Sequence, residues 1–215
     1  MQHTGAVISG SAVLTILPDY QFIPNDLDFF VLPVGFGSVL KYIEDNGYDI
    51  VPYDVDVRHY FDQQLVVVNM IHCTSGANVN VVTGVKTHVV GLITDFCSTL
   101  VMNYIGWYGL VVLYPDWTFC KSGLIIGDVT RWDKWLMKYV ERGVDHHRDV
   151  FELAGPLEEH CCRVHPYCPA LTRSLYDGYS YVEPFEPNDF NFKASEHNFE
   201  WLLPVTCSFE TLSLN

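Results

Sequence analysis

Two aspartates two positions apart, Asp26 and Asp28, are the side chains of this sequence best suited to chemistry. They stand at the start of residues 26–32, a run rich in aromatic and branched residues that indicates a β-strand. On a strand, residues i and i+2 project from the same face. Two adjacent carboxylates repel each other, and a divalent cation relieves that repulsion. Because oxygen-rich clusters suit Mg²⁺ or Mn²⁺, we expect Asp26 and Asp28 to bind one of these ions.

A turn that could hold a phosphate precedes this pair. Gly10 and Ser11 follow a short strand predicted at residues 7–8 and open a brief helix predicted over residues 12–17. Glycine permits close approach of the backbone to a ligand, while the serine hydroxyl and the N–H groups at a helix start can bind phosphate. Phosphate donors beside paired carboxylates form the layout that metal-dependent nucleotidyl transfer needs.

At these residues the sequence resembles the nucleotidyltransferase superfamily related to DNA polymerase β. The pattern of that superfamily is an apolar residue, Gly, Gly or Ser, a spacer, and then Asp, an apolar residue, and Asp or Glu. Residues 8–11 and 26–28 match this pattern. The surrounding sequence looks like a fungal, basidiomycete-type branch of uncharacterised members of the superfamily. Two further pieces look similar to the same branch: residues 95–105 followed by 113–115, and residues 165–169 with Arg173 and Asp177.

The resemblance implies an activity and a set of site residues. Gly10 and Ser11 would hold the phosphates of an NTP, and Asp26 and Asp28 would bind Mg²⁺ or Mn²⁺. The superfamily normally adds a third carboxylate on a later strand, which helps to deprotonate the attacking hydroxyl. Here Asn80 is expected at that place, as the third member of the catalytic set. An amide is neutral, is a poorer metal ligand and cannot act as a base.

Two functions therefore stay open at this point. The first is transfer of a nucleotidyl group from an NTP to a hydroxyl acceptor. The second is a degenerate member of the same fold, kept as a binding or scaffold module that lacks the third carboxylate. A reading without function is also open, in which Asp26 and Asp28 are exposed acids at a sheet edge and Ser9 or Ser11 is an ordinary helix N-cap.

The remaining patterns indicate an α/β (α+β) fold with a small mixed sheet flanked by helices. A helix is expected over residues 38–46, after a loop at Gly35-Phe36-Gly37, and a hairpin over residues 65–83. An amphipathic helix is expected over residues 130–142, with one buried face made of Trp132, Trp135, Leu136, Tyr139 and Val140. We expect a nucleotidyltransferase-like core at residues 1–123 and a helical and irregular extension at residues 124–215.

Composition limits the partners. The chain has 215 residues, and its 12 basic and 26 acidic residues give a formal net charge of −14. Such a surface does not attract phosphate backbones in general, so we expect a small-molecule or protein acceptor rather than a long nucleic acid. There is no apolar run of membrane-spanning length and no signal-peptide pattern at the start, so we expect no membrane partner and an intracellular protein, cytoplasmic or nuclear.

Seven cysteines are present, and four of them stand among apolar residues. We expect these four to be reduced and buried as small hydrophobes: Cys73, Cys97, Cys120 and Cys207. Cys162, His165 and Cys168 have a spacing that could hold zinc, with His160, Cys161 or Cys207 as a fourth ligand, but no second pair stands at finger distance. We therefore expect no zinc. His146 and His147 are expected at the surface end of the preceding helix rather than at a metal.

Overall fold

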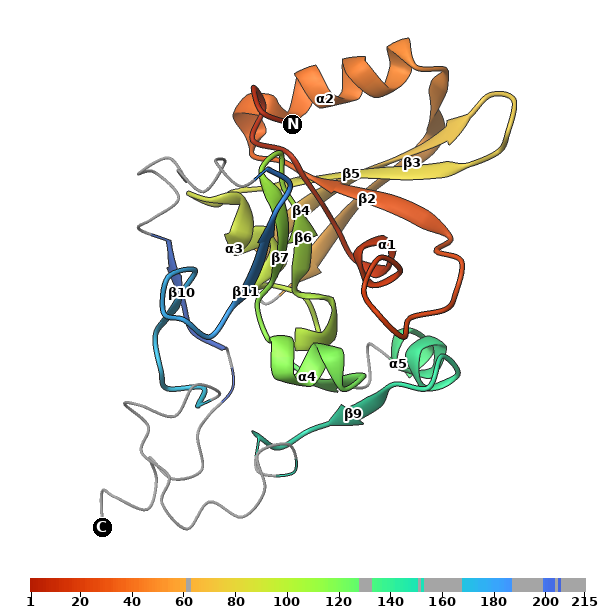
Figure 1. Ribbon diagram of the computed structural model, residues 1–215. Coiled ribbons are helices and arrows are strands. Elements are labelled where there is room, and N and C mark those ends of the chain that lie inside the picture. The colour runs from red at the N-terminus through yellow and green to blue at the C-terminus, as the bar shows by residue number, and fades with distance from the viewer. Residues whose placement is uncertain are drawn as a thin grey trace. The chain divides into compact units, whose positions relative to one another are not determined.

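The strand that carries Asp26 and Asp28 lies at the centre of an eight-stranded mixed sheet (Figure 1). The computed structural model describes residues 1–60, 63–127, 133–150, 152, 168–186, 199–203 and 205. The strands of the sheet, in spatial order, are β11 (Tyr181–Pro184), β7 (Gly109–Val112), β6 (Asn103–Ile105), β1 (Val7–Ser9), β2 (Asp26–Phe30), β5 (Asn78–Gly84), β4 (Gln63–His72) and β3 (Tyr48–Tyr60). β2 pairs with β1 in antiparallel and with β5 in parallel fashion. The fold is thus mixed α/β, as the sequence predicts.

The described residues contain five short α-helices and one 3₁₀ turn, so strands outnumber helices. They are α1 (Ser11–Leu14), α2 (Pro33–Asp45), α3 (Val89–Ile93), α4 (Pro115–Phe119), α5 (Asp133–Val140) and the 3₁₀ turn η1 (Thr99–Val101). Figure 1 shows α2 on one side of the central strands and α1 on the other. No helix in the described ranges is long and apolar enough to cross a membrane.

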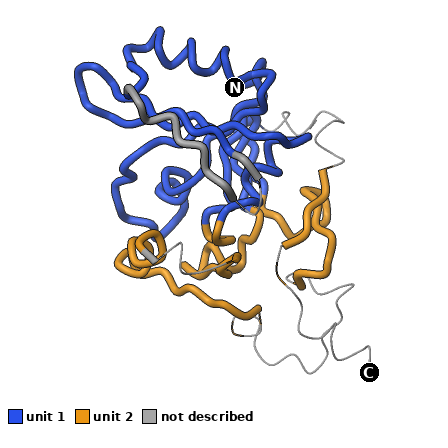
Figure 2. Tube along the Cα trace, turned by 180° about the vertical axis from the view of Figure 1, so that it is seen from behind, with its two compact units in different colours: residues 1–96, 101–112, 182–191 blue, residues 97–100, 113–181, 192–215 orange. Residues whose placement is uncertain are grey.

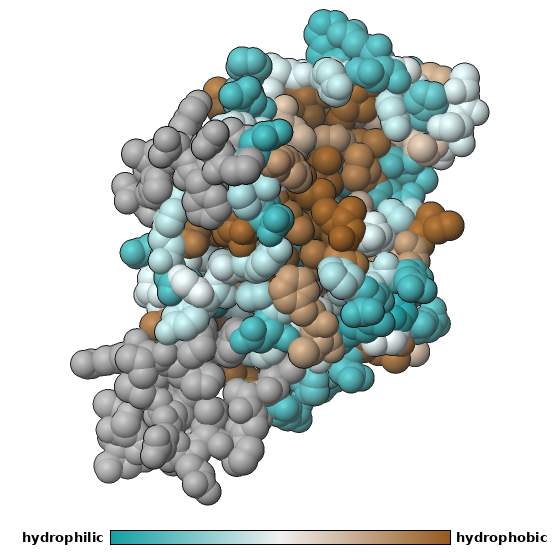
Figure 3. Space-filling model, viewed as in Figure 1, coloured by the Kyte–Doolittle hydropathy of each residue, from teal (hydrophilic) through white to brown (hydrophobic). Residues whose placement is uncertain are grey.

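An apolar core fills the space between α2 and the sheet. Val39 and Ile43 of α2 are buried against alternate residues of the central strands, among them Val79, Val81 and Met70. Figure 3 shows apolar side chains gathered beneath α2 and hydrophilic ones on its outer side. The residues between these strand positions therefore point to the opposite face of the sheet.

The loop expected at Gly35-Phe36-Gly37 is wrong, because α2 begins at Pro33 and includes these residues. Proline is favoured in the first helical turn, where its fixed φ suits the helix and its missing N–H costs nothing. Gly35 lies close to the chain start: a Cβ there would stand 2.7 Å from the carbonyl oxygen of Thr4. This glycine serves close packing inside the helix and does not mark a loop.

The predicted hairpin is confirmed by the antiparallel pairing of β4 and β5. Its outer neighbour β3, thirteen residues long, carries no clear signal in the sequence. The register between β3 and β4 shifts between Ile50 and Val55, around Pro52. Proline in a strand is confined to edges and bulges, and a bulge interrupts the alternation that sequence reading depends on.

The chain divides into two compact units (Figure 2). Unit 1 comprises residues 1–96, 101–112 and 182–191, and unit 2 comprises residues 97–100, 113–181 and 192–215. Unit 2 holds two small sheets, in which β8 (Ser122–Leu124) pairs with β9 (Asp145–His147), and β10 (Arg173–Ser174) with β12 (Glu200–Trp201). The expected boundary at residues 123/124 stays a prediction.

Helix α5 is found within the segment expected to be helical, residues 130–142. Residues 130–132 of that segment, and with them the expected position of Trp132, lie outside the described part. Leu136 and Tyr139 are buried as predicted. Val140 is 50% exposed, so its placement on the buried face is wrong. The helix ends at Val140, and the last turn of an amphipathic pattern need not lie against the core.

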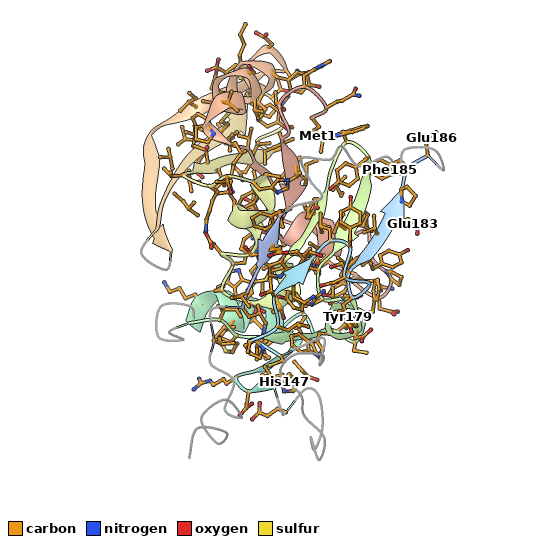
Figure 4. All side chains as sticks on the ribbon, turned by 90° about the vertical axis from the view of Figure 1, so that its left-hand side faces the viewer. Met1, His147, Tyr179, Glu183, Phe185 and Glu186 are labelled. Atoms are coloured by element: carbon orange, nitrogen blue, oxygen red, sulfur yellow. The ribbon has the colours of Figure 1, made fainter. Side chains whose placement is uncertain are left out.

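Strand β11 is an edge strand, at one end of the sheet order. Glu183 lies on this strand and Phe185 follows its last residue (Figure 4). The backbone N–H of Phe185 donates to the carbonyl of Tyr108 at 3.0 Å. A Cβ at Gly109 would clash with the backbone of Glu183, so glycine permits this close pairing.

Candidate functional site

Asp26 and Asp28 share strand β2, at the positions that the i, i+2 spacing predicts. Their strand neighbours Leu27 and Phe29 pack against the core beneath α2. Because side chains alternate along a strand, both aspartates point to the opposite face of the sheet. Both are half-buried rather than fully exposed. The reading of Asp26 and Asp28 as exposed acids at a sheet edge therefore does not fit, since β2 lies between β1 and β5.

Asn80 of β5 joins the two carboxylates. The parallel pairing of β2 and β5 places Asn80 opposite Asp28. The side-chain nitrogen Nδ2 of Asn80 donates to Oδ1 of Asp28 at 2.7 Å and to Oδ2 of Asp26 at 3.2 Å. Hydrogen bonds to an ionised acceptor are stronger than those between neutral groups. The amide thus stabilises two like charges that would otherwise repel each other.

Gly10 brings the turn after β1 against the same carboxylates. Its φ of 77° and ψ of −153° lie in a region that only glycine occupies readily. A Cβ at Gly10 would stand 2.5 Å from Oδ2 of Asp28. The turn and the second aspartate are therefore in direct contact, which requires a residue without a side chain.

The serines on either side of Gly10 have different surroundings. Ser9 is fully buried, and its hydroxyl donates to the carbonyl of Asn103 at 2.5 Å, which ties β1 to β6. Ser11 is 3% exposed, and its hydroxyl finds no hydrogen-bond partner among the described residues. A buried hydroxyl without a partner is costly, so Ser11 is a polar group that a ligand would satisfy. Neither Ser9 nor Ser11 caps α1 with its side chain.

A polar row continues beyond the predicted residues. Asn69 of β4 lies directly opposite Asn80, and Asn78 of β5 lies opposite Asp26. Residues directly opposite in a sheet project from the same face. The sequence analysis did not single out Asn69 or Asn78, because their alignment depends on strand pairing between distant segments. The only available signal was the pair Asn78 and Asn80, two positions apart in a β-branched strand.

The donor set suits a hard divalent cation. Carboxylate and amide oxygens are the ligands that Mg²⁺ and related ions prefer. Asp26, Asp28 and the amide oxygen of Asn80 could supply such ligands from two adjacent strands. Within the described ranges, no group of three His, Cys, Asp or Glu side chains could hold a metal ion. A third carboxylate is therefore missing from this part of the chain, in line with Asn80 at the third position.

The expected absence of zinc stays a prediction. Cys161, Cys162 and His165 lie outside the described residues, and so does Cys207. Cys168 is buried. Of the four cysteines expected to be buried, Cys97 is buried, whereas Cys73 and Cys120 are exposed, so the expectation is wrong for these two.

His146 and His147 lie on strand β9, so their expected position at a helix end is wrong. The ring of His146 faces Trp135 and Tyr139, at centroid distances of 5.7 and 6.2 Å. Neither of its ring nitrogens has a hydrogen-bond partner in the described part of the chain. Burial, with a smaller contribution from neighbouring His147, lowers the pKa of His146 to about 4. The ring is therefore neutral at physiological pH, which is the form that an apolar setting favours.

A cation buried among aromatic rings organises unit 2. Arg173 is 1% exposed, and its guanidinium lies 5.2 Å from the ring centroid of Tyr114 and 5.5 Å from that of Trp201. It pairs with the carboxylate of Asp177 and donates to the carbonyl of Leu113 at 3.2 Å. These contacts join Arg173 to other residues of unit 2. This cluster therefore reads as an anchor for the strands β10 and β12.

Comparison with known proteins adds no assignment. No family model matches the chain, and no curated protein matches its sequence. The functional argument therefore depends on the geometry around Asp26 and Asp28.

Proposed function

We propose that the protein is nucleotidyltransferase-like and binds an NTP and a divalent metal, Mg²⁺ or Mn²⁺, at the face of the sheet formed by β1, β2 and β5. What supports this most is a single contact set: two aspartates on one strand, bridged by Asn80 and touched by the backbone of Gly10. Three segments distant in the sequence thus meet at one place. The half-buried oxygen donors there are of the kind that a metal–phosphate complex needs.

Each residue has a definite task in this proposal. Asp26 and Asp28 hold the metal, which when bound neutralises phosphate charge. The hydroxyl of Ser11 donates to a phosphate oxygen, and Gly10 lets that phosphate approach the backbone. Before a metal binds, Asn80 holds the two carboxylates together with its hydrogen bonds. It cannot accept a proton from an attacking hydroxyl, so this step would fall to another base or to solvent.

The proposed partners follow from charge and compartment. The donor is an NTP, and the acceptor is a hydroxyl of a small molecule or a protein, since a net charge of −14 does not favour a long nucleic acid. An NTP donor and the free thiols of Cys73, Cys97 and Cys120 fit an intracellular location.

The test is binding of Mn²⁺, alone and with a non-hydrolysable NTP, to the wild type and to Asp28→Ala. We expect the wild type to bind both ligands and the variant to lose Mn²⁺ binding. Asp49→Ala is the matched control, because Asp49 lies on β3 of the same sheet and is remote from β2 in the strand order. Equal Mn²⁺ binding by all three proteins would place the metal elsewhere and refute the proposal.

One observation favours the second candidate, a non-catalytic binding or scaffold module of the same fold. The amide of Asn80 already satisfies one oxygen of each aspartate. A neutral amide in this position stabilises the carboxylates without a metal, so the fold could persist after activity was lost. Nucleotidyl transfer is the discriminating measurement: transfer to a supplied acceptor that Asp28→Ala abolishes supports the enzyme. Binding of an NTP without any transfer supports the module.

A further inference from the structure

The orientation of the Asn80 amide sets whether the aspartate pair can accept a cation. In the structure Nδ2 of Asn80 faces both carboxylates, at 2.7 Å from Asp28 and 3.2 Å from Asp26. An N–H group directed at these oxygens points a partial positive charge into the space that a shared cation would use. A divalent ion shared through these two oxygens therefore competes with this amide orientation.

The opposite orientation has the opposite preference. Rotation of the amide by about 180° exchanges Nδ2 and Oδ1, which are almost equal in size. The oxygen would then face two carboxylates, which is repulsive unless a cation stands between them. With a cation present, an amide oxygen is an acceptable third ligand beside carboxylates. Amide orientation and cation occupancy are thus linked. The NH₂ group faces the carboxylates when no cation is bound, and the oxygen faces them when a cation is bound.

We propose that Asn80 is a two-state gate for this site: its NH₂ group closes the carboxylate pair without a cation, and its oxygen joins the ligand set when a cation binds. This inference rests on the proposed function, because it assumes that the pair receives a metal. A second observation supports a ligand at the turn after β1. The buried Ser11 hydroxyl, next to Gly10 in the chain, has no hydrogen-bond partner among the described residues.

A gate and an amide that only competes with the cation predict different effects of Asn80→Ala on cation binding. If the oxygen of Asn80 becomes a ligand, Asn80→Ala loses a ligand and weakens cation binding. If the amide only competes with the cation, Asn80→Ala removes the competitor and strengthens binding. Asn80→Asp supplies a charged oxygen in both orientations and is expected to bind a cation most tightly.

The experiment is calorimetric titration of the full chain with Mn²⁺ for the wild type, Asn80→Asp and Asn80→Ala, with Asn78→Ala as the matched control. Asn78 is exposed, lies on the same strand and face as Asn80, and makes no side-chain hydrogen bond to Asp26 or Asp28 in the described structure. We expect Asn80→Ala to bind about 10–100-fold more weakly than the wild type, the range known for residues that organise metal ligands. Asn78→Ala should match the wild type. Far-UV circular dichroism verifies that each variant folds.

A second readout follows the rotation itself. In ¹⁵N-labelled protein, the side-chain NH₂ signals of Asn80, assigned by their loss in Asn80→Asp, should move on addition of Mg²⁺ much more than those of Asn78. Unmoved Asn80 signals at saturating Mg²⁺ would overturn the gate, as would equal or tighter Mn²⁺ binding by Asn80→Ala. Failure of every variant to bind Mn²⁺ would instead refute the proposed function, and the gate with it. Binding by the variants but not by the wild type would show a permanent lock and also overturn the gate.

Discussion

Replacement of Gly10 by alanine probes the contact between the turn after β1 and the aspartate pair. Two physical effects are expected. The backbone of Gly10, at φ 77° and ψ −153°, is strained for any residue with a Cβ, at a cost of about 1–3 kcal/mol. The new methyl group would also stand 2.5 Å from Oδ2 of Asp28. An ordinary contact begins at 3.4 Å, so the carboxylate would have to retreat by about 0.9 Å.

That retreat acts on the ligand rather than on the fold. The short Asp28 side chain can rotate away from the methyl group, which disturbs its hydrogen bond from Asn80. Metal ligands, however, must lie within about 0.2 Å of their preferred distances. We therefore expect Gly10→Ala to weaken Mn²⁺ binding by about 10–100-fold, as loss of ligand positioning does in other metal sites. Calorimetric titration measures this affinity, and urea denaturation measures the loss of stability separately.

Gly5→Ala is the matched control. Gly5 also has a positive φ, of 65°, but a Cβ there meets nothing within 4 Å. It should lose about 1–2 kcal/mol of stability through backbone strain and leave Mn²⁺ affinity unchanged. If Gly10→Ala binds Mn²⁺ as tightly as Gly5→Ala does, the turn does not position Asp28 for a metal, and the reasoning from this contact is refuted.

Three further predictions concern the fold. Arg173→Ala should lower the free energy of unfolding in urea by about 3–5 kcal/mol, since it leaves the partly buried Asp177 without its cation. Lys41→Ala breaks an exposed ion pair of the same spacing and should leave the urea midpoint unchanged. Equal effects of the two variants would contradict the assigned role of burial. Because burial lowers the pKa of His146 to about 4, below its ordinary 6.5, the folded state binds fewer protons than the unfolded state, so stability should fall as pH drops from about 6.5 towards 4. His146→Phe should remove that part of the pH dependence in melting curves, and an unchanged dependence would contradict the burial argument. Gly37→Ala has open space around its new Cβ and should raise the melting temperature, because helix stability gains about 0.5–1 kcal/mol. Gly35→Ala should lower the melting temperature, because its Cβ meets the carbonyl of Thr4. The reverse order would show that α2 does not begin at Pro33.

Sequence reading located β2 and its aspartate pair because the relevant pattern is local. Alternation along five residues is enough to place Asp26 and Asp28 on one face, and the β-branched strand around Asn80 is equally plain. The reading failed where a local signal had two meanings. Glycines at positions 35 and 37 indicate a loop in most contexts, yet here they lie in a helix that packs closely against Thr4.

The arrangement of the candidate site was beyond a local reading. Asn80 meets both aspartates only because β2 and β5 pair in parallel at one register, although Asp28 and Asn80 are 52 positions apart in the sequence. A shift by one residue would turn Asn80 into the core and expose Val79. The contact between Gly10 and Asp28 likewise depends on the pairing of β1 with β2. These contacts depend on pairing between strands that are distant in the sequence. Periodicity within one segment does not encode such pairing.

The central claim is that a divalent cation binds between strands β2 and β5. Anomalous diffraction from crystals grown with Mn²⁺ and a non-hydrolysable NTP tests this most directly. We expect a manganese peak about 2.2 Å from a carboxylate oxygen of Asp26 and of Asp28, with a phosphate near the Ser11 hydroxyl. A nucleotide or manganese ion bound only elsewhere, with the Asn80 amide still donating to both aspartates at saturating Mn²⁺, would contradict it.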